Sequence, residues 1–191
     1  MTTFWWIRHG PTHARGMVGW TDVPADLSDH VTLNRLDLAL PQEAPVISSD
    51  LTRAIATADA IAGERPRLPH DSNLRELHFG AWETRRHDEV DAESPDLIRA
   101  FWDQPGTVRA PGGESWNDLR TRVDAAVDRL ALEHAGGHVI VVAHFGAILS
   151  QVQRARGITP REAFAQKIDN LSLTRIAHDG AWHLGEVNHH P

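Results

Sequence analysis

The chain has 191 residues, of which 41% are hydrophobic and 24% charged, a composition typical of one globular domain. It contains no cysteine, which excludes disulfide frameworks, cysteine-ligated metal sites and a cysteine nucleophile. The net charge of −7 argues against a nucleic-acid partner, and no segment is apolar over a length that would cross a membrane. Because the N-terminus shows no secretory signal, we expect a cytoplasmic protein.

The chain opens with a predicted buried strand that leads into charged residues and a glycine. Residues 4–7 form a short apolar run, and Arg8, His9 and Gly10 follow directly. In α/β sheets such a strand delivers its last residues to the carboxyl edge, where ligands bind. We interpret His9 as a nucleophile that attacks phosphorus and Arg8 as a ligand of the phosphoryl oxygens. A strand followed by an ordinary turn is the alternative.

A second strand and a helix are predicted at residues 46–62. The strand covers residues 46–49, Asp50 is the expected N-cap, and Gly63 is expected to end the helix. This arrangement places Arg53 in the first helical turn, beside the strand end. A helix N-terminus favours anions, and a guanidinium binds phosphate through two parallel hydrogen bonds. Arg53 is therefore a candidate phosphate ligand, although a solvated helix arginine would show the same pattern.

The most clearly marked strand is residues 138–143, which is apolar on both faces, as a central parallel strand should be. It runs into His144, and a helix is expected at residues 147–156. A second apolar strand therefore ends in a histidine, as the first does. A buried structural histidine is the alternative for His144.

Further elements are expected in the rest of the chain. They are short helices at 33–40 and 160–168, a short strand at 67–70, helical segments within 86–102 interrupted near Pro95, an amphipathic helix at 119–134, and a hairpin of strands 171–177 and 181–187 around an Asp-Gly turn.

In chain order these segments resemble the signatures of the histidine phosphatase superfamily, the phosphoglycerate-mutase-like enzymes. The resemblance covers nearly the whole chain. Within the family, the chain is most similar to the small phosphatases of the α-ribazole phosphatase type. Its motifs are Arg8-His9-Gly10-x-Thr12, Gly19 to Pro24, Ser48 to Ala54, Leu74-Arg75-Glu76 through Glu83, Pro111 to Ser115, and Val142-Ala143-His144.

The resemblance implies a covalent mechanism. His9 attacks a phosphomonoester and becomes a phosphohistidine, while Arg8, Arg53 and His144 surround the phosphoryl group. Glu76 protonates the leaving oxygen and then activates water. No metal and no other cofactor is implied, since the arginines stabilise the charge that a metal would stabilise elsewhere. Glu83 is an alternative acid, although a loop-stabilising role suits it better.

The resemblance also implies contacts with a small phosphorylated substrate. The expected substrate-binding residues are Thr12, Arg15, Trp20, Glu114 and Phe145. Arg15 stands where the family usually has asparagine and could reach a second anionic group. Phe145 stands where glycine is usual, which would narrow the pocket.

We therefore expect one histidine phosphatase domain over residues 1–191. Its fold would be a three-layer α/β/α sandwich with a mostly parallel sheet and an antiparallel edge, and residues 78–112 would form a small cap. The expected function is a metal-independent phosphomonoester hydrolase. A phosphoglycerate-type phosphomutase and a non-catalytic phosphate-ligand-binding protein remain alternatives, and the sequence leaves open a monomer or a homodimer.

Overall fold

A computed structural model describes all residues from Met1 to Pro191 and contains one mixed five-stranded sheet. The strands are β1 (Thr2–Arg8), β2 (Val46–Ser48), β3 (His138–Ala143), β4 (Leu173–His178) and β5 (Trp182–Leu184), in the spatial order β2-β3-β1-β4-β5. Strands β2, β3 and β1 are parallel, whereas β4 and β5 pair antiparallel at the edge. The predicted sheet, including its antiparallel hairpin, is confirmed.

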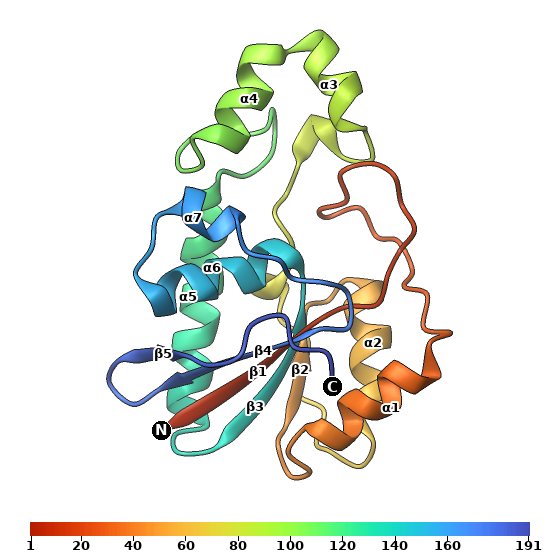
Figure 1. The fold of residues 1–191 in the computed structure, drawn as a ribbon, viewed down its shortest axis with the longest axis vertical. Coiled ribbons are helices and arrows are strands. Elements are labelled where there is room, and N and C mark those ends of the chain that lie inside the picture. The colour runs from red at the N-terminus through yellow and green to blue at the C-terminus, as the bar shows by residue number, and fades with distance from the viewer.

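Helices cover both faces of this sheet, which gives the three expected layers (Figure 1). Alternate strand residues point to opposite faces, so Phe4 and Trp6 pack with helices α5 (Trp116–Glu133) and α6 (Phe145–Arg156). Ile7 belongs to the other core, with α1 (His30–Ala39) and α2 (Thr52–Ala62). The central strand β3 contributes to both cores, as its two-faced apolar pattern predicts.

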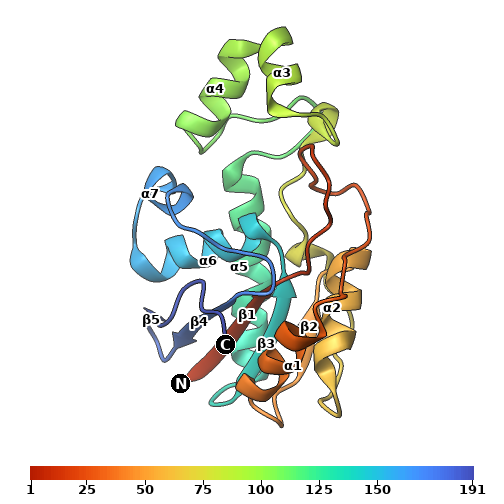
Figure 2. The same cartoon turned by 45° about the vertical axis from the view of Figure 1, so that its right-hand side comes forward.

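The helices α3 (His87–Glu93) and α4 (Pro95–Asp103) lie apart from the sheet, beyond the carboxyl ends of its parallel strands (Figures 1 and 2). Two short 3₁₀ turns, η1 (Ser72–Leu74) and η2 (Gly80–Trp82), lead toward them, and α7 (Pro160–Phe164) follows α6. The rings of Trp102 and Phe164, 5.8 Å apart, connect α4 with α7. No helix of the structure has the length and apolar character needed to cross a bilayer.

Three local predictions are wrong. Asp50 does not cap α2, because its carboxylate pairs with Arg75, and Asp22 accepts the Thr52 N–H at 2.8 Å instead. The expected strand at 67–70 is only a single bridge between Val46 and Arg67, since prolines at 66 and 69 have no N–H to donate to a ladder. The helix expected to reach residue 168 ends at Phe164.

Candidate active site

His9 and His144 follow β1 and β3, which are neighbouring parallel strands, so the sheet brings the two histidines together. The His9 N–H donates to Ala143 O at 3.0 Å, and the two imidazole rings lie 5.0 Å apart. Both side chains are buried. The pairing of two strand-end histidines, inferred from sequence, is therefore a feature of the structure.

The hydrogen bonds of His9 fix its tautomer. Nδ1 lies 2.7 Å from Gly10 O and must donate its proton to that carbonyl, which leaves a lone pair on Nε2. Arg53 Nε donates to this Nε2 at 3.3 Å. Burial, followed by the charge of Arg53, lowers the pKa of His9 from 6.5 to about 3. His9 is consequently a neutral imidazole with an unprotonated Nε2 at neutral pH.

Arg53 is almost fully buried, with 1% of its surface exposed. Its Nη1 donates to Thr21 O at 3.0 Å and its Nη2 to Gly19 O at 2.6 Å. Together with the bond to His9, these contacts use three of the five guanidinium N–H groups. The remaining donors are available to an anion beside His9.

The loop that carries those carbonyls is held by Glu83. Its carboxylate accepts the N–H groups of Gly19, Trp20, Thr21 and Phe79 at 2.8 to 3.2 Å. Burial alone would raise the pKa of Glu83, but these bonds lower it below its ordinary value. Glu83 therefore stabilises a loop, as the preferred interpretation of the sequence stated.

A cavity of about 150 Å³ adjoins His9. It is lined by Arg8, His9, Thr12, Ala14, Gly16, Val18, Arg53 and Glu76. Arg8 Nη1 donates to Ile168 O at 2.6 Å, while its buried Nε has no partner. Thr12 Oγ1 accepts a long bond from Ala14 N and keeps its own proton free to donate. The cavity thus combines two guanidinium groups, a hydroxyl, a carboxylate and an unprotonated imidazole nitrogen.

Glu76 lies at the N-terminus of α6. The Gly146 N–H points at both carboxylate oxygens, at 3.0 and 3.1 Å, and the Leu77 N–H reaches Oε1 at 2.8 Å. A β-carbon on residue 146 would lie 2.4 Å from Oε1, so only glycine leaves room for the carboxyl group there. This glycine was not recognised from sequence as a site residue, because its role depends on a contact with a residue 70 positions away.

His144 is fully buried, and its Nε2 lies 2.6 Å from the hydroxyl oxygen of Ser49. Its Nδ1 has no hydrogen-bond partner. Burial, followed by the neighbouring His9 and Arg53, lowers the pKa of His144 well below its ordinary value. The second histidine is therefore also neutral, although it is not among the residues that line the cavity.

The other expected substrate-binding residues lie outside this cavity. Arg15 is exposed on a loop whose alternate residues line the cavity, and it is not itself a lining residue. The Phe145 ring lies 5.4 Å from the Arg8 guanidinium carbon. Trp20 and Glu114 contact other groups. Trp20 donates its indole N–H to the backbone carbonyl of Glu76, and Glu114 pairs with Arg122.

Two supporting residues escaped the sequence interpretation. Asn170 Nδ2 donates to His9 O at 2.8 Å, and Arg122 donates to several backbone carbonyls around Glu76. Both belong to segments that look like ordinary loop and helix surface in the sequence. Only the tertiary fold places them against the site.

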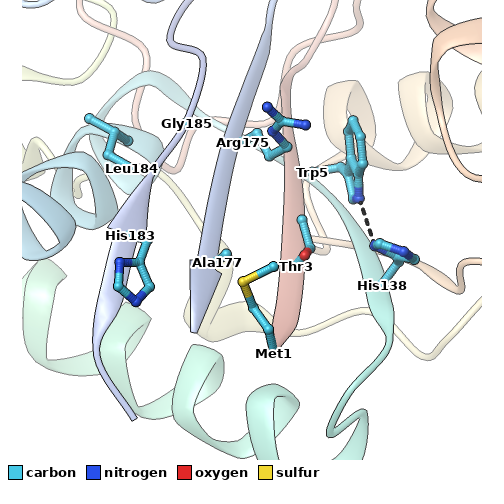
Figure 3. A pocket seen from close by; sticks show the side chains of 9 residues that line it. All are labelled: Met1, Thr3, Trp5, His138, Arg175, Ala177, His183, Leu184 and Gly185. Atoms are coloured by element: carbon cyan, nitrogen blue, oxygen red, sulfur yellow. Dashed lines mark hydrogen bonds between the residues drawn. The ribbon is translucent and has the colours of Figure 1, made fainter. Parts of the chain in front are cut away.

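A larger hollow of about 410 Å³ lies at the opposite, amino end of β1 and β3 (Figure 3). There the side chains of Trp5 and His138 point toward each other from neighbouring strands, and Trp5 Nε1 donates to His138 Nδ1 at 3.3 Å. None of the expected catalytic or substrate-binding residues lines this hollow. Nowhere does the structure group three histidine, aspartate or glutamate side chains in a way that would hold a metal ion.

Comparison with known proteins shows the family of the chain. The sequence model described as "Histidine phosphatase superfamily (branch 1)" matches residues 4–189. Phosphoglycerate mutase-like protein 4 of Arabidopsis thaliana is 32% identical over 197 residues, covering 96% of this chain and 84% of that protein. Glucosyl-3-phosphoglycerate phosphatase of Mycolicibacterium vanbaalenii is 34% identical over 168 residues, 80% of this chain and 73% of that protein. Several mycobacterial relatives are 33% identical over 148 residues, a match that spans 40% of their length.

Solved structures share the whole fold. YhfR of Bacillus stearothermophilus has a TM-score of 0.88 at 29% identity, over 96% of this chain and 95% of that one. A mycobacterial glucosyl-3-phosphoglycerate phosphatase has a TM-score of 0.84 at 27% identity, covering 97% and 98%. The α-ribazole phosphatase of Shigella flexneri, at 22% identity, a TM-score of 0.83 and coverages of 98% and 96%, is a likeness of fold.

The three-layer fold, the two strand-end histidines and these matches point to one class of α/β enzyme. The chain belongs to the histidine phosphatase superfamily, in its branch 1. Its relatives support a hydrolase of phosphatase type or a mutase.

Proposed function

We propose that this protein is a metal-independent phosphomonoester hydrolase that acts on a small phosphorylated metabolite through a phosphohistidine on His9. The observation that carries the proposal is the neutral imidazole of His9. Its Nε2 is unprotonated and lies beside Arg53, in a cavity that Arg8 and Glu76 also line.

In the first step the phosphoryl group enters this cavity. Donors from Arg8, Arg53, Thr12 and His144 bind its oxygens and stabilise the charge that spreads over them in the transition state. The Nε2 lone pair of His9 attacks phosphorus and forms the N–P bond as the ester P–O bond breaks. The bond from Nδ1–H to Gly10 O stabilises the positive charge that the ring then acquires. Glu76, protonated in the substrate complex, gives its proton to the departing oxygen.

In the second step the phosphohistidine is hydrolysed. The Glu76 carboxylate takes a proton from water, and the water oxygen attacks phosphorus as the N–P bond breaks. Inorganic phosphate leaves, His9 regains its lone pair, and Glu76 is again protonated. The same carboxyl group therefore serves as acid and then as base, which requires that it stay close to both the leaving oxygen and the attacking water.

At about 150 Å³ the cavity is smaller than the roughly 300 to 1,000 Å³ of typical small-molecule pockets. We infer that the rest of the substrate extends outward, past Thr12 and Phe145, toward a cap formed by residues 78–112. An exposed Arg15 at that rim would meet a second anionic group only on a substrate that reaches beyond the cavity. The relatives named as glucosyl-3-phosphoglycerate phosphatases support a substrate that is larger than the cavity.

A mutase is the second candidate, because a relative at 32% identity is named as mutase-like. A mutase must return the phosphoryl group from His9 to an organic acceptor before water attacks. Conversion of 3-phosphoglycerate to 2-phosphoglycerate, faster than phosphate release, would favour it over the hydrolase.

The experiment that tests the proposal is phosphate release in EDTA from a panel of phosphomonoesters, with wild type and His9→Ala. The panel contains 3-phosphoglycerate, sugar phosphates, nucleotides and a nucleoside-like monophosphate. We expect turnover that resists EDTA and that His9→Ala abolishes. Absence of turnover and of any phosphoenzyme would instead support a phosphate-ligand-binding protein.

A further inference from the structure

The backbone of Glu76 is held by a set of donors separate from those around its carboxyl group. Arg122, on α5, donates Nη1 to the carbonyl oxygens of Asn73 at 2.8 Å and Arg75 at 2.7 Å. Its Nη2 donates to the carbonyl of Glu76 itself at 2.8 Å. One guanidinium therefore binds the chain at and immediately before Glu76.

Glu114 fixes this guanidinium from the other side. Its Oε1 accepts from Arg122 Nε and its Oε2 from Nη2, both at 2.8 Å. The two side chains are only 14% and 16% exposed. All five N–H donors of Arg122 thus have an acceptor inside the protein, so this arginine is saturated and has no donor left for substrate.

Trp20 supplies a second bond to the same carbonyl. Its indole Nε1 donates to Glu76 O at 2.7 Å, and its ring stacks on His78 with centroids 4.6 Å apart. His78 and Glu114 are themselves joined twice, through Glu114 N to His78 O at 2.9 Å and His78 N to Glu114 Oε2 at 3.0 Å. These bonds join the chain where it leaves for α3 and α4, at His78, to the chain where it returns, at Glu114. We call this pair of segments the neck of the cap.

We propose that the Arg122–Glu114 pair positions the proton donor. By fixing the Glu76 carbonyl, it determines where the carboxyl group lies relative to Gly146 and His9, and it ties that position to the neck of the cap. Trp20 assists in the same role. This inference rests on the proposed function of Glu76 and gives Trp20 and Glu114 a positioning role in place of direct substrate binding.

The role has a chemical signature. Departure of a strongly basic alkoxide needs the proton from Glu76, whereas p-nitrophenolate leaves readily without it. Because kcat/KM reports steps up to formation of the phosphohistidine, a displaced Glu76 lowers this ratio for an alkyl ester and spares it for an aryl ester. Hydrolysis of the phosphohistidine still needs Glu76 as base, so the aryl ester then shows a burst of nitrophenolate followed by slow turnover.

The test compares Arg122→Gln with wild type on glycerol 3-phosphate and p-nitrophenyl phosphate. We expect kcat/KM to fall about 10- to 100-fold for the alkyl ester and less than about threefold for the aryl ester, with a burst on the latter. Trp20→Phe, which keeps an aromatic side chain and removes the N–H donor, should lower kcat/KM for the alkyl ester relative to the aryl ester by a smaller factor.

Arg129→Gln is the matched control, since Arg129 lies on the same helix and also forms ion pairs, with Asp71 and Glu133. This substitution should leave the ratio of the kcat/KM values for the two esters unchanged. Equal losses on both esters in a folded Arg122→Gln protein, or an equal change in Arg129→Gln, would overturn the positioning role.

A readout without turnover separates this inference from the proposed function. The Gly146 amide, which donates to Glu76, should shift in ¹⁵N NMR spectra of Arg122→Gln and not of Arg129→Gln. An unmoved Gly146 signal contradicts the positioning role even in an active enzyme. Hydrolysis that survives His9→Ala contradicts the proposed function even if the Gly146 signal moves.

Discussion

Arg53 Nε lies 3.3 Å from His9 Nε2, so a buried cation donates a hydrogen bond to the nitrogen that we assign as the nucleophile. Burial, followed by the charge of Arg53, lowers the pKa of His9 to about 3, so its Nε2 stays unprotonated beside the guanidinium that we propose binds phosphate. When a phosphoryl group enters, its oxygens can take over the Arg53 donor and expose the lone pair.

The first prediction concerns pH and stability. Unfolded His9 takes up a proton near pH 6.5, whereas folded His9 does so only near pH 3. As pH falls between these values the unfolded state binds more protons, so the free energy of unfolding decreases. Between pH 7 and pH 5, the free energy of unfolding of His9→Ala should therefore fall by about 2 kcal/mol less than that of wild type, as measured by urea unfolding.

The control is His87→Ala, at an exposed position on α3. It should follow the wild-type pH dependence. Identical curves for His9→Ala and wild type would show that His9 titrates normally in the folded state, which contradicts the geometry described here.

The second prediction concerns the place of the proton donor. Gly146→Ala puts a β-carbon 2.4 Å from Glu76 Oε1 and pushes the carboxyl group away, while alanine suits the helix. We expect kcat/KM for alkyl phosphates to fall about 10- to 100-fold with little change in Tm. Gly106→Ala, where no atom lies within 4 Å of the added carbon, should retain wild-type rates. Full activity in Gly146→Ala would remove the case for Glu76 in this position.

The third prediction separates two adjacent buried serines. The Oγ of Ser49 lies 2.6 Å from His144 Nε2. The Oγ of Ser48 lies 3.1 Å from Nδ1 of His70, which does not line the cavity. Ser49→Ala leaves the His144 ring without its partner and should lower kcat about 10-fold. Ser48→Ala should keep the wild-type kcat. Steady-state kinetics on the best substrate of the panel checks both, and equal effects would argue against a role for the Ser49–His144 contact.

The fourth prediction concerns backbone strain at Thr84, which follows Glu83. Its φ of 65° lies in the left-handed region, which is costly for a β-branched residue. Thr84→Gly should raise the free energy of unfolding by about 0.5 to 1 kcal/mol, although glycine also gains freedom in the unfolded chain. Thr107→Gly, at an exposed residue without a positive φ, should be neutral or destabilising. Thermal unfolding of both variants decides the matter, and a lower Tm for Thr84→Gly would contradict the strain.

Much of the fold could be predicted because the signals are local. The two-faced apolar run of β3, the Asp-Gly hairpin and the stop of α2 at Gly63 each lie within a few residues of sequence. The cap on α2 could not be predicted, since Asp22 reaches Thr52 from a different loop and Asp50 is drawn to Arg75.

The same distinction applies to the site. His9 and His144 each follow a predicted strand of a mostly parallel sheet, and the carboxyl ends of parallel strands meet at one edge, so their proximity could be predicted. The contacts of Arg122, Asn170 and Gly146 depend on packing between distant segments and carry no local signature. Arg15 is not among the residues that line the cavity, because a motif position alone does not determine on which side of a loop a side chain lies.

The central claim is that His9 carries the phosphoryl group, and trapping that intermediate tests it most directly. The protein is mixed with a ³²P-labelled phosphomonoester from the panel, denatured rapidly in alkali, and mapped by peptide analysis. We expect label on the His9 peptide that survives alkali, is lost in acid, and is absent from His9→Ala. Steady phosphate release with no label on His9, or with the same label in His9→Ala, would contradict it.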